Sequence, residues 1–220
     1  NAETVRKLGT ADLDAVIALQ QAVLASLPKD QDVLHVKTRE EFAGILHDPD
    51  KCVIGIDSEN GLGAMSVIIE PTQSNPDADT LDFPLPDRPD KLSTLSSVVV
   101  GPDQQGGNLM TAMLDFWRDR AYQQGRNNLL SIVTRSNTPS WHSFLKSGLK
   151  VTDAGIDPVD GSSVYLVHKD LEKPQCRQRE SCSSTFNLAA RPIPVSDTFS
   201  LTALRGLLRA GFRGAYAERS

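Results

Sequence analysis

The chain has 220 residues, of which 39% are hydrophobic, and its formal net charge is −5. This supplies enough apolar material for one large domain, or one domain with an appendage, and the acidic balance disfavours general nucleic-acid binding. No run of about 18 or more apolar residues occurs and the N-terminus lacks a secretory stretch, so we expect no membrane span and a cytoplasmic protein.

The N-terminal quarter predicts one strand followed by two helices. Val5–Leu8 has strand character. Thr10 is expected to cap the first helix, which Pro28 ends. Thr38 and Glu41 have the spacing of a capping box, in which each residue satisfies a free backbone N–H at a helix start, and they predict the second helix.

A hairpin and a long surface excursion follow. Cys52–Ile56 and Leu62–Glu70 read as strands, and the Asn60-Gly61 pair between them is typical of a tight hairpin turn. Pro71–Lys91 has little periodicity and is rich in proline and aspartate. We interpret it as a loop, either a solubilising one or an acidic rim that attracts an amine; its aspartates are Asp77, Asp79, Asp82, Asp87 and Asp90.

The central part predicts a strand–helix–strand unit. Leu92–Val100 is a strand whose valines suggest burial on both faces, Asn108–Gln124 is an amphipathic helix, and Leu129–Thr134 is a strand. Such a unit places Val98–Val100 parallel to Leu129–Thr134. The flanking hairpin is antiparallel.

The last elements complete the predicted fold. Ser136 or Asn137 caps a short helix that runs through Lys146, and Lys150–Ala154 and Ser163–His168 are the final strands. The resulting fold class is α/β (α+β), with a mixed, mostly antiparallel sheet and helices on both faces.

The C-terminal part differs in charge from the rest. From Glu172 onward there are eight Lys/Arg and four Asp/Glu, so residues 1–171 carry the acidic excess. We expect one domain over residues 1–171, a linker over 172–198 and an amphipathic helix over 199–220. That basic helix would dock on the acidic body in cis or on another subunit, which would make a homodimer, or lie on a membrane surface.

The turn between the valine strand and the next helix is a candidate anion site. Gly101 to Asn108 leads into the helix, where free backbone N–H groups and the helix dipole favour negative charge. Its glycines would let a pyrophosphate approach the backbone. An ordinary glycine-rich connection is the alternative. Neither the G-x-G-x-x-G nor the Walker pattern is present.

These stretches resemble the GNAT-type acyl-CoA N-acyltransferase superfamily. Val100-Gly101-Pro102 matches the family's Val-x-Pro, and Gln105 holds the Gln/Arg position of its Gln/Arg-x-x-Gly-x-Gly/Ala motif. Asn108 and Met110 stand where that motif has Gly and Gly/Ala. Asn137 and Phe144, with Gly148-Leu149 after them, match a second family stretch that ends the coenzyme site.

The resemblance implies a set of coenzyme-binding residues. The strand backbone would pair with the pantetheine arm, the turn would hold the pyrophosphate, and Asn137 and Phe144 would lie along the arm and near its sulfur. The complete set is Val98, Val99, Val100, Gln105, Gly106, Gly107, Asn108, Leu109, Met110, Asn137 and Phe144.

Two departures concern catalysis. Phe144 stands where the family's acid is usually a tyrosine, and a phenyl ring donates no proton. Leu92–Val100 contains no carboxylate, although the family's base is commonly found there. Glu70 and His142 are the candidate catalytic bases; a solvated strand-end charge and a surface helix residue are the respective alternatives.

The resemblance therefore implies an N-acetyltransferase that uses acetyl-CoA as co-substrate and a small-molecule or protein amine as acceptor. The alternative is a GNAT-fold protein that binds acyl-CoA and regulates a partner without catalysis; a purely structural interaction module is a third possibility. No metal is expected, because the three cysteines, Cys52, Cys176 and Cys182, have no further ligands at metal-binding spacing.

Overall fold

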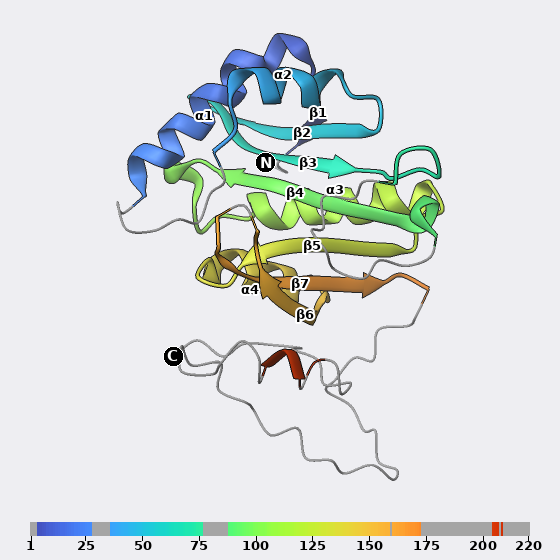
Figure 1. Cartoon of the computed structure of the whole chain (residues 1–220). Helices are drawn as coiled ribbons and strands as arrows, with labels where there is room; N and C mark the ends of the chain where they lie inside the picture. Colours follow the sequence, from blue (N-terminus) through green and yellow to red (C-terminus); the bar gives the residue numbers. More distant parts are fainter. Residues whose placement is uncertain are drawn as a thin grey trace.

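The computed structural model describes residues 4–27, 36–76, 88–158, 160–172, 204–206 and 208. Their centre is a seven-stranded sheet in the order β1-β2-β3-β4-β5-β7-β6, in which only β4 and β5 are parallel (Figure 1). The strands are β1 (Val5–Lys7), β2 (Lys51–Ser58), β3 (Gly61–Ile69), β4 (Leu92–Val100), β5 (Asn128–Thr134), β6 (Lys150–Ile156) and β7 (Ser163–Asp170). The predicted mixed, mostly antiparallel sheet is confirmed.

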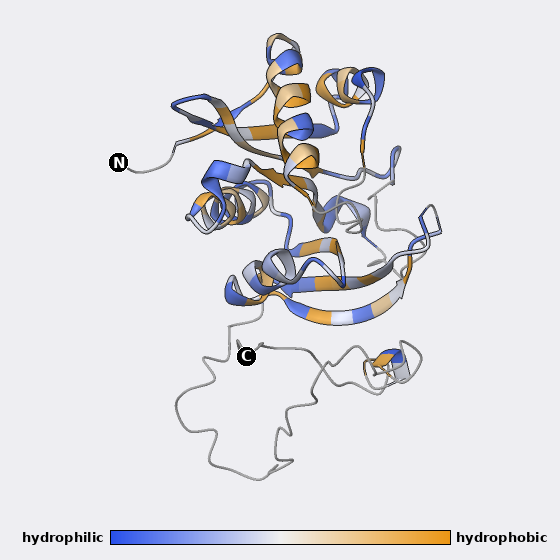
Figure 2. Cartoon of the chain, turned by 90° about the vertical axis from the view of Figure 1, so that its left-hand side faces the viewer, coloured by the Kyte–Doolittle hydropathy of each residue, from blue (hydrophilic) through white to orange (hydrophobic). Residues whose placement is uncertain are grey.

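Helices cover both faces of the sheet, as the sequence predicts. α1 (Leu13–Ser26) and α2 (Arg39–His47) lie on one face, and α3 (Leu109–Gln123) and α4 (Thr138–Lys146) lie on the other (Figure 1). Figure 2 shows hydrophobic residues concentrated in the strands between the two helical layers. Each layer has its own buried cluster, because strand side chains alternate between the faces.

The two N-terminal helices begin differently. The Thr38–Glu41 capping box is confirmed: the Thr38 hydroxyl accepts from Glu41 N and Glu41 Oε2 accepts from Thr38 N. The prediction that Thr10 caps the first helix is wrong. Residues Thr10–Asp12 form a 3₁₀ turn, and the Asp12 carboxylate, ion-paired with Arg6, accepts from Gly9 N at 2.9 Å.

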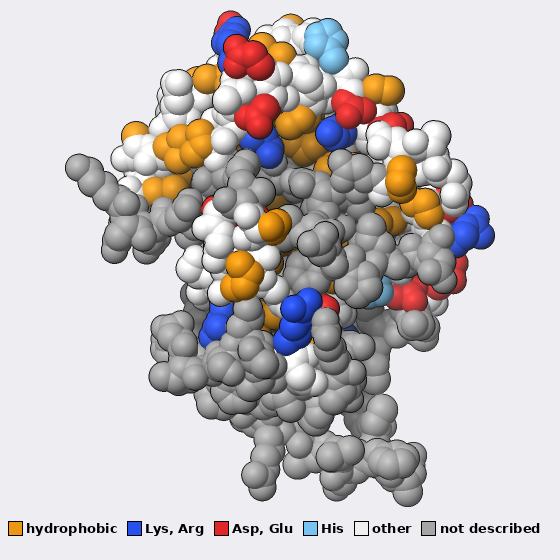
Figure 3. Space-filling view, viewed as in Figure 1, with side chains coloured by type: hydrophobic (Ala, Val, Ile, Leu, Met, Phe, Trp, Pro, Cys, Tyr) orange, Lys and Arg blue, Asp and Glu red, His pale blue; other side chains and the backbone are white. Residues whose placement is uncertain are grey.

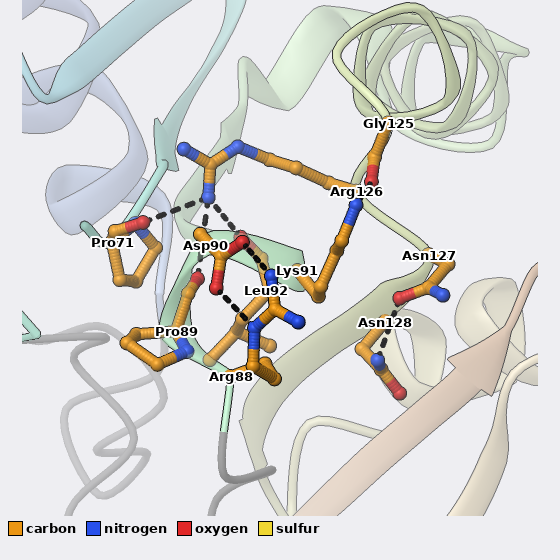
Figure 4. Close-up of polar contacts among 10 residues, drawn as sticks. All are labelled: Pro71, Arg88, Pro89, Asp90, Lys91, Leu92, Gly125, Arg126, Asn127 and Asn128. Carbon is orange, nitrogen blue, oxygen red and sulfur yellow. Dashed lines mark hydrogen bonds and ion pairs between the residues drawn. The ribbon is translucent and has the colours of Figure 1, made fainter. Parts of the chain in front are cut away.

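Arg126 ties together the two ends of the long excursion between β3 and β4. Its guanidinium donates to the carbonyl oxygens of Pro71 at 2.8 Å and Leu92 at 2.6 Å, with a longer bond to Pro89 at 3.4 Å (Figure 4). Of the excursion's aspartates, Asp90 is ion-paired with Arg88, and Asp77, Asp79, Asp82 and Asp87 lie outside the described residues. The acidic-rim interpretation therefore stays untested.

The described part of the C-terminal tail packs on the body. Leu204 and Leu208 are buried in the same cluster as α3 and α4, and Arg205 lies 3.5 Å from Asp153 of β6. The rest of the predicted linker and helix lies outside the described residues. Within the described part of the chain, no helix is long and apolar enough to cross a bilayer.

Candidate functional site

β4 and β5 pair for only a short distance and then separate. Their parallel register comprises Leu92↔Asn128, Ser93↔Leu129 and Thr94↔Leu130, and no further β4–β5 pair occurs among the described residues. Just beyond, the Ser131 hydroxyl donates to Leu95 O at 2.7 Å. The parallel pair is thus confirmed, but its contact lies at the start of β4. The Val98–Val100 end is not paired with β5, so no described strand occupies the position beside it.

A bulge lies at the point where β4 leaves β5. The register with β3 shifts between Met65 and Val67, opposite Ser97 and Val98. Ser97 has φ +51°, the left-handed region that non-glycine residues rarely occupy, and the buried Ser66 hydroxyl holds the neighbouring Ser96 O at 2.9 Å. Bulges and strained residues of this kind concentrate at functional sites.

The glycine turn follows the open end of β4. Gln105 to Asn108 are exposed, and Gly106 has φ +82°, a conformation that glycine adopts without strain. The N–H groups of Gly106 and of the first helical residues Leu109 and Met110 make no hydrogen bond among the described residues, and the Asn108 side chain does not cap α3. The turn therefore presents free donors at a helix N-terminus, where the dipole favours an anion.

Asn137 lies at the matching end of β5, and Phe144 lies deeper. The Asn137 side chain caps α4 by accepting from Ser140 N at 3.3 Å. Because β4 and β5 are parallel, their C-terminal ends bring this cap and the glycine turn to the same edge of the sheet. Phe144 is 1% exposed within the α3–α4 cluster. Trp141 packs edge-on against Tyr165 and donates to Arg135 O.

Glu70, one of the two candidate bases, is engaged elsewhere. Both of its carboxylate oxygens accept from Arg120 at 2.7 Å, and its side chain is 10% exposed. Arg120 lies about 16 Å along α3 from Leu109, at a rise of about 1.5 Å per residue. Glu70 is therefore not the solvated charge of the alternative interpretation but one half of a partly buried ion pair near the N-terminal end of β4.

His142, the other candidate base, lies on α4 with its ring edge-on to Trp141, the centroids 4.3 Å apart. Its catalytic role stays a prediction. Cys52 is buried, and burial raises the pKa of its thiol, so it is a neutral core side chain. Among the described residues, no group of three or more potential metal ligands occurs.

A pocket of about 140 Å³ lies between α2 and the sheet, against the bulge. Its wall combines two serines of β4 with apolar and basic side chains: Lys37, Ile45, Lys51, Val67, Ile69, Ser96 and Ser97. Reasoning from the sequence missed Lys37 and Lys51. Lys37 directly precedes the capping box, and no local pattern connects it with Lys51 or with the serine-rich strand.

No family model matches the sequence, and no curated protein matches it significantly. Solved structures do match. An acetyltransferase of the GNAT family from Streptococcus pneumoniae has a TM-score of 0.57 at 18% identity over 76% of this chain and 98% of its own. yncA from Salmonella typhimurium, solved with its cofactor acetyl-CoA, has a TM-score of 0.58 at 17% identity over 82% of this chain and 100% of its own. The ribosomal-protein-S18-alanine N-acetyltransferase from Escherichia coli has a TM-score of 0.57 at 16% identity over 80% of this chain and 97% of its own. The chain thus has the fold of GNAT acetyltransferases.

Proposed function

We propose that this protein is an acyl-CoA-dependent N-acyltransferase, with acetyl-CoA as the donor. The observation that carries the proposal is the separation of β4 from β5 directly before an uncapped, glycine-flanked helix N-terminus. An extended pantetheine arm fits the open strand position by main-chain pairing. The pyrophosphate fits the free donors of the turn. The acetyl-CoA bound to yncA supports the same ligand for the shared fold.

The roles follow from the position of each group. Val98, Val99 and Val100 offer the β4 backbone to the arm, and residues 105–110 offer N–H groups to the pyrophosphate. Asn137 lies across the opening. Its side-chain oxygen caps α4, and its side-chain amide nitrogen has no partner among the described residues. Phe144 contributes an apolar wall and no proton.

The transfer itself needs little covalent chemistry from the protein. A neutral amine nitrogen attacks the thioester carbonyl carbon, the C–N bond forms and the C–S bond breaks. The nitrogen gives up one proton through water, and the leaving thiolate takes up one proton through water. The ammonium proton first passes to a water held by hydroxyls. Thr94 is 2% exposed, and its hydroxyl has no hydrogen-bond partner among the described residues. With Ser96 and Ser97 it forms a row of hydroxyls along β4.

Hydroxyl groups are poor bases near neutral pH. The reactive neutral amine must therefore come mostly from the fraction of the acceptor that is already deprotonated in solution. Turnover is therefore expected to rise about tenfold per pH unit below the pKa of the acceptor amine, with no plateau near pH 6 to 7 from a resident histidine. A plateau that disappears in His142→Gln would instead assign the base to His142.

Calorimetric titration with acetyl-CoA tests the binding half of the proposal. Gly106→Val should weaken acetyl-CoA binding about tenfold or more, because a Cβ at this left-handed position distorts the turn that cradles the pyrophosphate. Gly161→Val is the matched control: Gly161 also has a positive φ (+74°) and nothing near its Cβ position, but it lies in the β6–β7 turn. Equal effects of the two variants, or no heat from the native protein at millimolar acetyl-CoA, would refute the proposal.

A non-catalytic acyl-CoA sensor is the second candidate. Two observations favour it: the buried Phe144 in the place of the acid, and the engagement of Glu70 by Arg120. A thiol-release assay over amino acids, polyamines, aminoglycosides and peptides separates the two candidates. Tight acetyl-CoA binding without release above the hydrolytic background across the panel would select the sensor.

A further inference from the structure

The pocket beside the bulge has a polar side and an apolar side. Ser96 and Ser97, whose hydroxyl oxygens lie 3.3 Å apart, line it from β4, and Ser97 belongs to the bulge. Ile45, Val67 and Ile69 supply the apolar wall. Because the pocket adjoins the open end of β4, a molecule in it lies next to the place where the acyl group is proposed to bind.

Lys37 is held at this pocket by a buried clamp. The Gln20 side chain, 4% exposed, donates to Lys37 O at 2.8 Å and accepts from Lys37 N at 2.9 Å. The next residue, Thr38, is fixed by its capping box with Glu41. Two consecutive backbone positions are thus pinned between α1 and α2. The start of the Lys37 side chain is therefore positioned without cost when a ligand binds.

The charges in the pocket do not cancel. Lys51 is paired with Asp48 at 3.3 Å, whereas Lys37 has no carboxylate partner among the described residues. Among the described residues the pocket therefore carries one unpaired basic side chain, on a chain whose net charge is −5. Figure 3 shows basic side chains beside both hydrophobic and acidic ones in the upper part of the view, where α1 and α2 lie. Such a pocket attracts a carboxylate and repels a polyamine.

We propose that the acceptor is a small amine that carries a carboxylate, that is, an amino acid with an apolar side chain. Its carboxylate binds Lys37 and Lys51, its side chain packs on Ile45, Val67 and Ile69, and its amine faces the β4 hydroxyls. The inference rests on the proposed function for the transfer step, whereas recognition of the carboxylate does not require it.

The size of the pocket agrees with this class of ligand. Its volume of about 140 Å³ holds one apolar side chain of moderate size; an engineered protein cavity of about 150 Å³ binds benzene. A folded peptide or an aminoglycoside would exceed it. The product keeps the carboxylate and gains an amide, so it leaves as an N-acyl amino acid with one charge fewer on nitrogen.

The test compares amino acids with their amides. Valine, leucine, methionine and phenylalanine, each with its carboxamide, are titrated calorimetrically into the full chain, with and without coenzyme A. The free acids are expected to bind at least about tenfold more tightly than the amides. Lys37→Met should remove that difference, and Lys37→Arg should keep it. Lys146→Met is the matched control, because Lys146 is an exposed lysine on α4.

Each outcome decides the inference. If no free acid binds, if acids and amides bind equally, or if spermidine is the preferred acceptor in the thiol-release assay, the inference is overturned while acetyl-CoA binding still stands. If Lys37→Met lowers the melting temperature of the chain, the test uses Lys51→Met and the acid-to-amide affinity ratio of the native protein instead. If acetyl-CoA does not bind but the acids are still preferred, the proposed function falls and the carboxylate site remains.

Discussion

The two ends of β4 belong to one continuous strand but have opposite surroundings. Leu92, Ser93 and Thr94 pair with β5, and Thr94 also pairs with β3; the indole N–H of Trp117 donates to the buried Ser93 hydroxyl at 2.9 Å. Val99 and Val100 pair with β3 alone and lead into exposed glycines. The closed end supplies stability, and the open end supplies unfilled hydrogen-bonding positions. The packed half of β4 thus anchors the half that offers the site.

The largest expected effect is at the closed end. Trp117→Ala removes the largest fully buried side chain of the core and leaves the Ser93 hydroxyl without its donor. We expect a loss of about 3–5 kcal/mol of unfolding free energy, measured by urea denaturation. Trp117→Phe, which keeps most of the packing, should lose clearly less. A loss of unfolding free energy below about 1 kcal/mol would show that the closed end does not supply the stability assigned to it.

Arg126→Ala should cost about 2–3 kcal/mol of stability, because it leaves the carbonyl oxygens of Pro71 and Leu92 without their donor. The affinity of the folded protein for acetyl-CoA should change little, since the hydrogen bonds of Arg126 lie at the Leu92 end of β4 (Figure 4). Arg118→Ala, which removes only exposed pairs on α3, is the control. If Arg126→Ala abolished coenzyme binding without unfolding the chain, the two ends would not be separable.

At the bulge we expect a smaller change of stability. Ser97→Val places a β-branched residue at φ +51° and should cost about 1–2 kcal/mol, whereas Ser97→Gly should be close to neutral. Both variants should reduce turnover if the hydroxyl holds the water of the transfer step. A Ser97→Gly variant that is as active as the native protein would limit the role of Ser97 to backbone shape. Thermal melting and thiol release measure the two parts.

The smallest effect concerns the outer edge of the sheet, far from β4. Hydrogen bonds from Arg6 lower the pKa of Asp12 and Asp57, so this stabilisation is present above the usual pKa of about 4 and is lost as the pH falls through the depressed values. Arg6→Ala should cost under about 1 kcal/mol at pH 7, because the groups are partly exposed. The difference from the native protein should shrink as the pH falls through the depressed pKa values of Asp12 and Asp57. A difference that persisted below those values would indicate a packing role for Arg6.

Much of the fold followed from local patterns, and the site only in part. The Asn60-Gly61 hairpin, the Thr38 capping box and the Asn137 cap were each predicted from two to four adjacent residues, because turns and helix starts are local. The point where β4 leaves β5 was not, since a run of valines looks alike whether its neighbour is a strand or a ligand. The Glu70–Arg120 pair joins residues 50 positions apart, so the candidate base could not be recognised as occupied.

The bulge at Ser97 also determines which face of the sheet each later side chain of β4 occupies. Before it, Leu95 belongs to the α3–α4 cluster; after it, Val99 belongs to the α1–α2 cluster, while Val98 and Val100 face α3. If Ser97 were instead accommodated in a regular strand, every side chain from Val98 onward would change faces, because strand positions alternate strictly. The bulge thus keeps Val98 and Val100 on the face of the sheet that α3 covers.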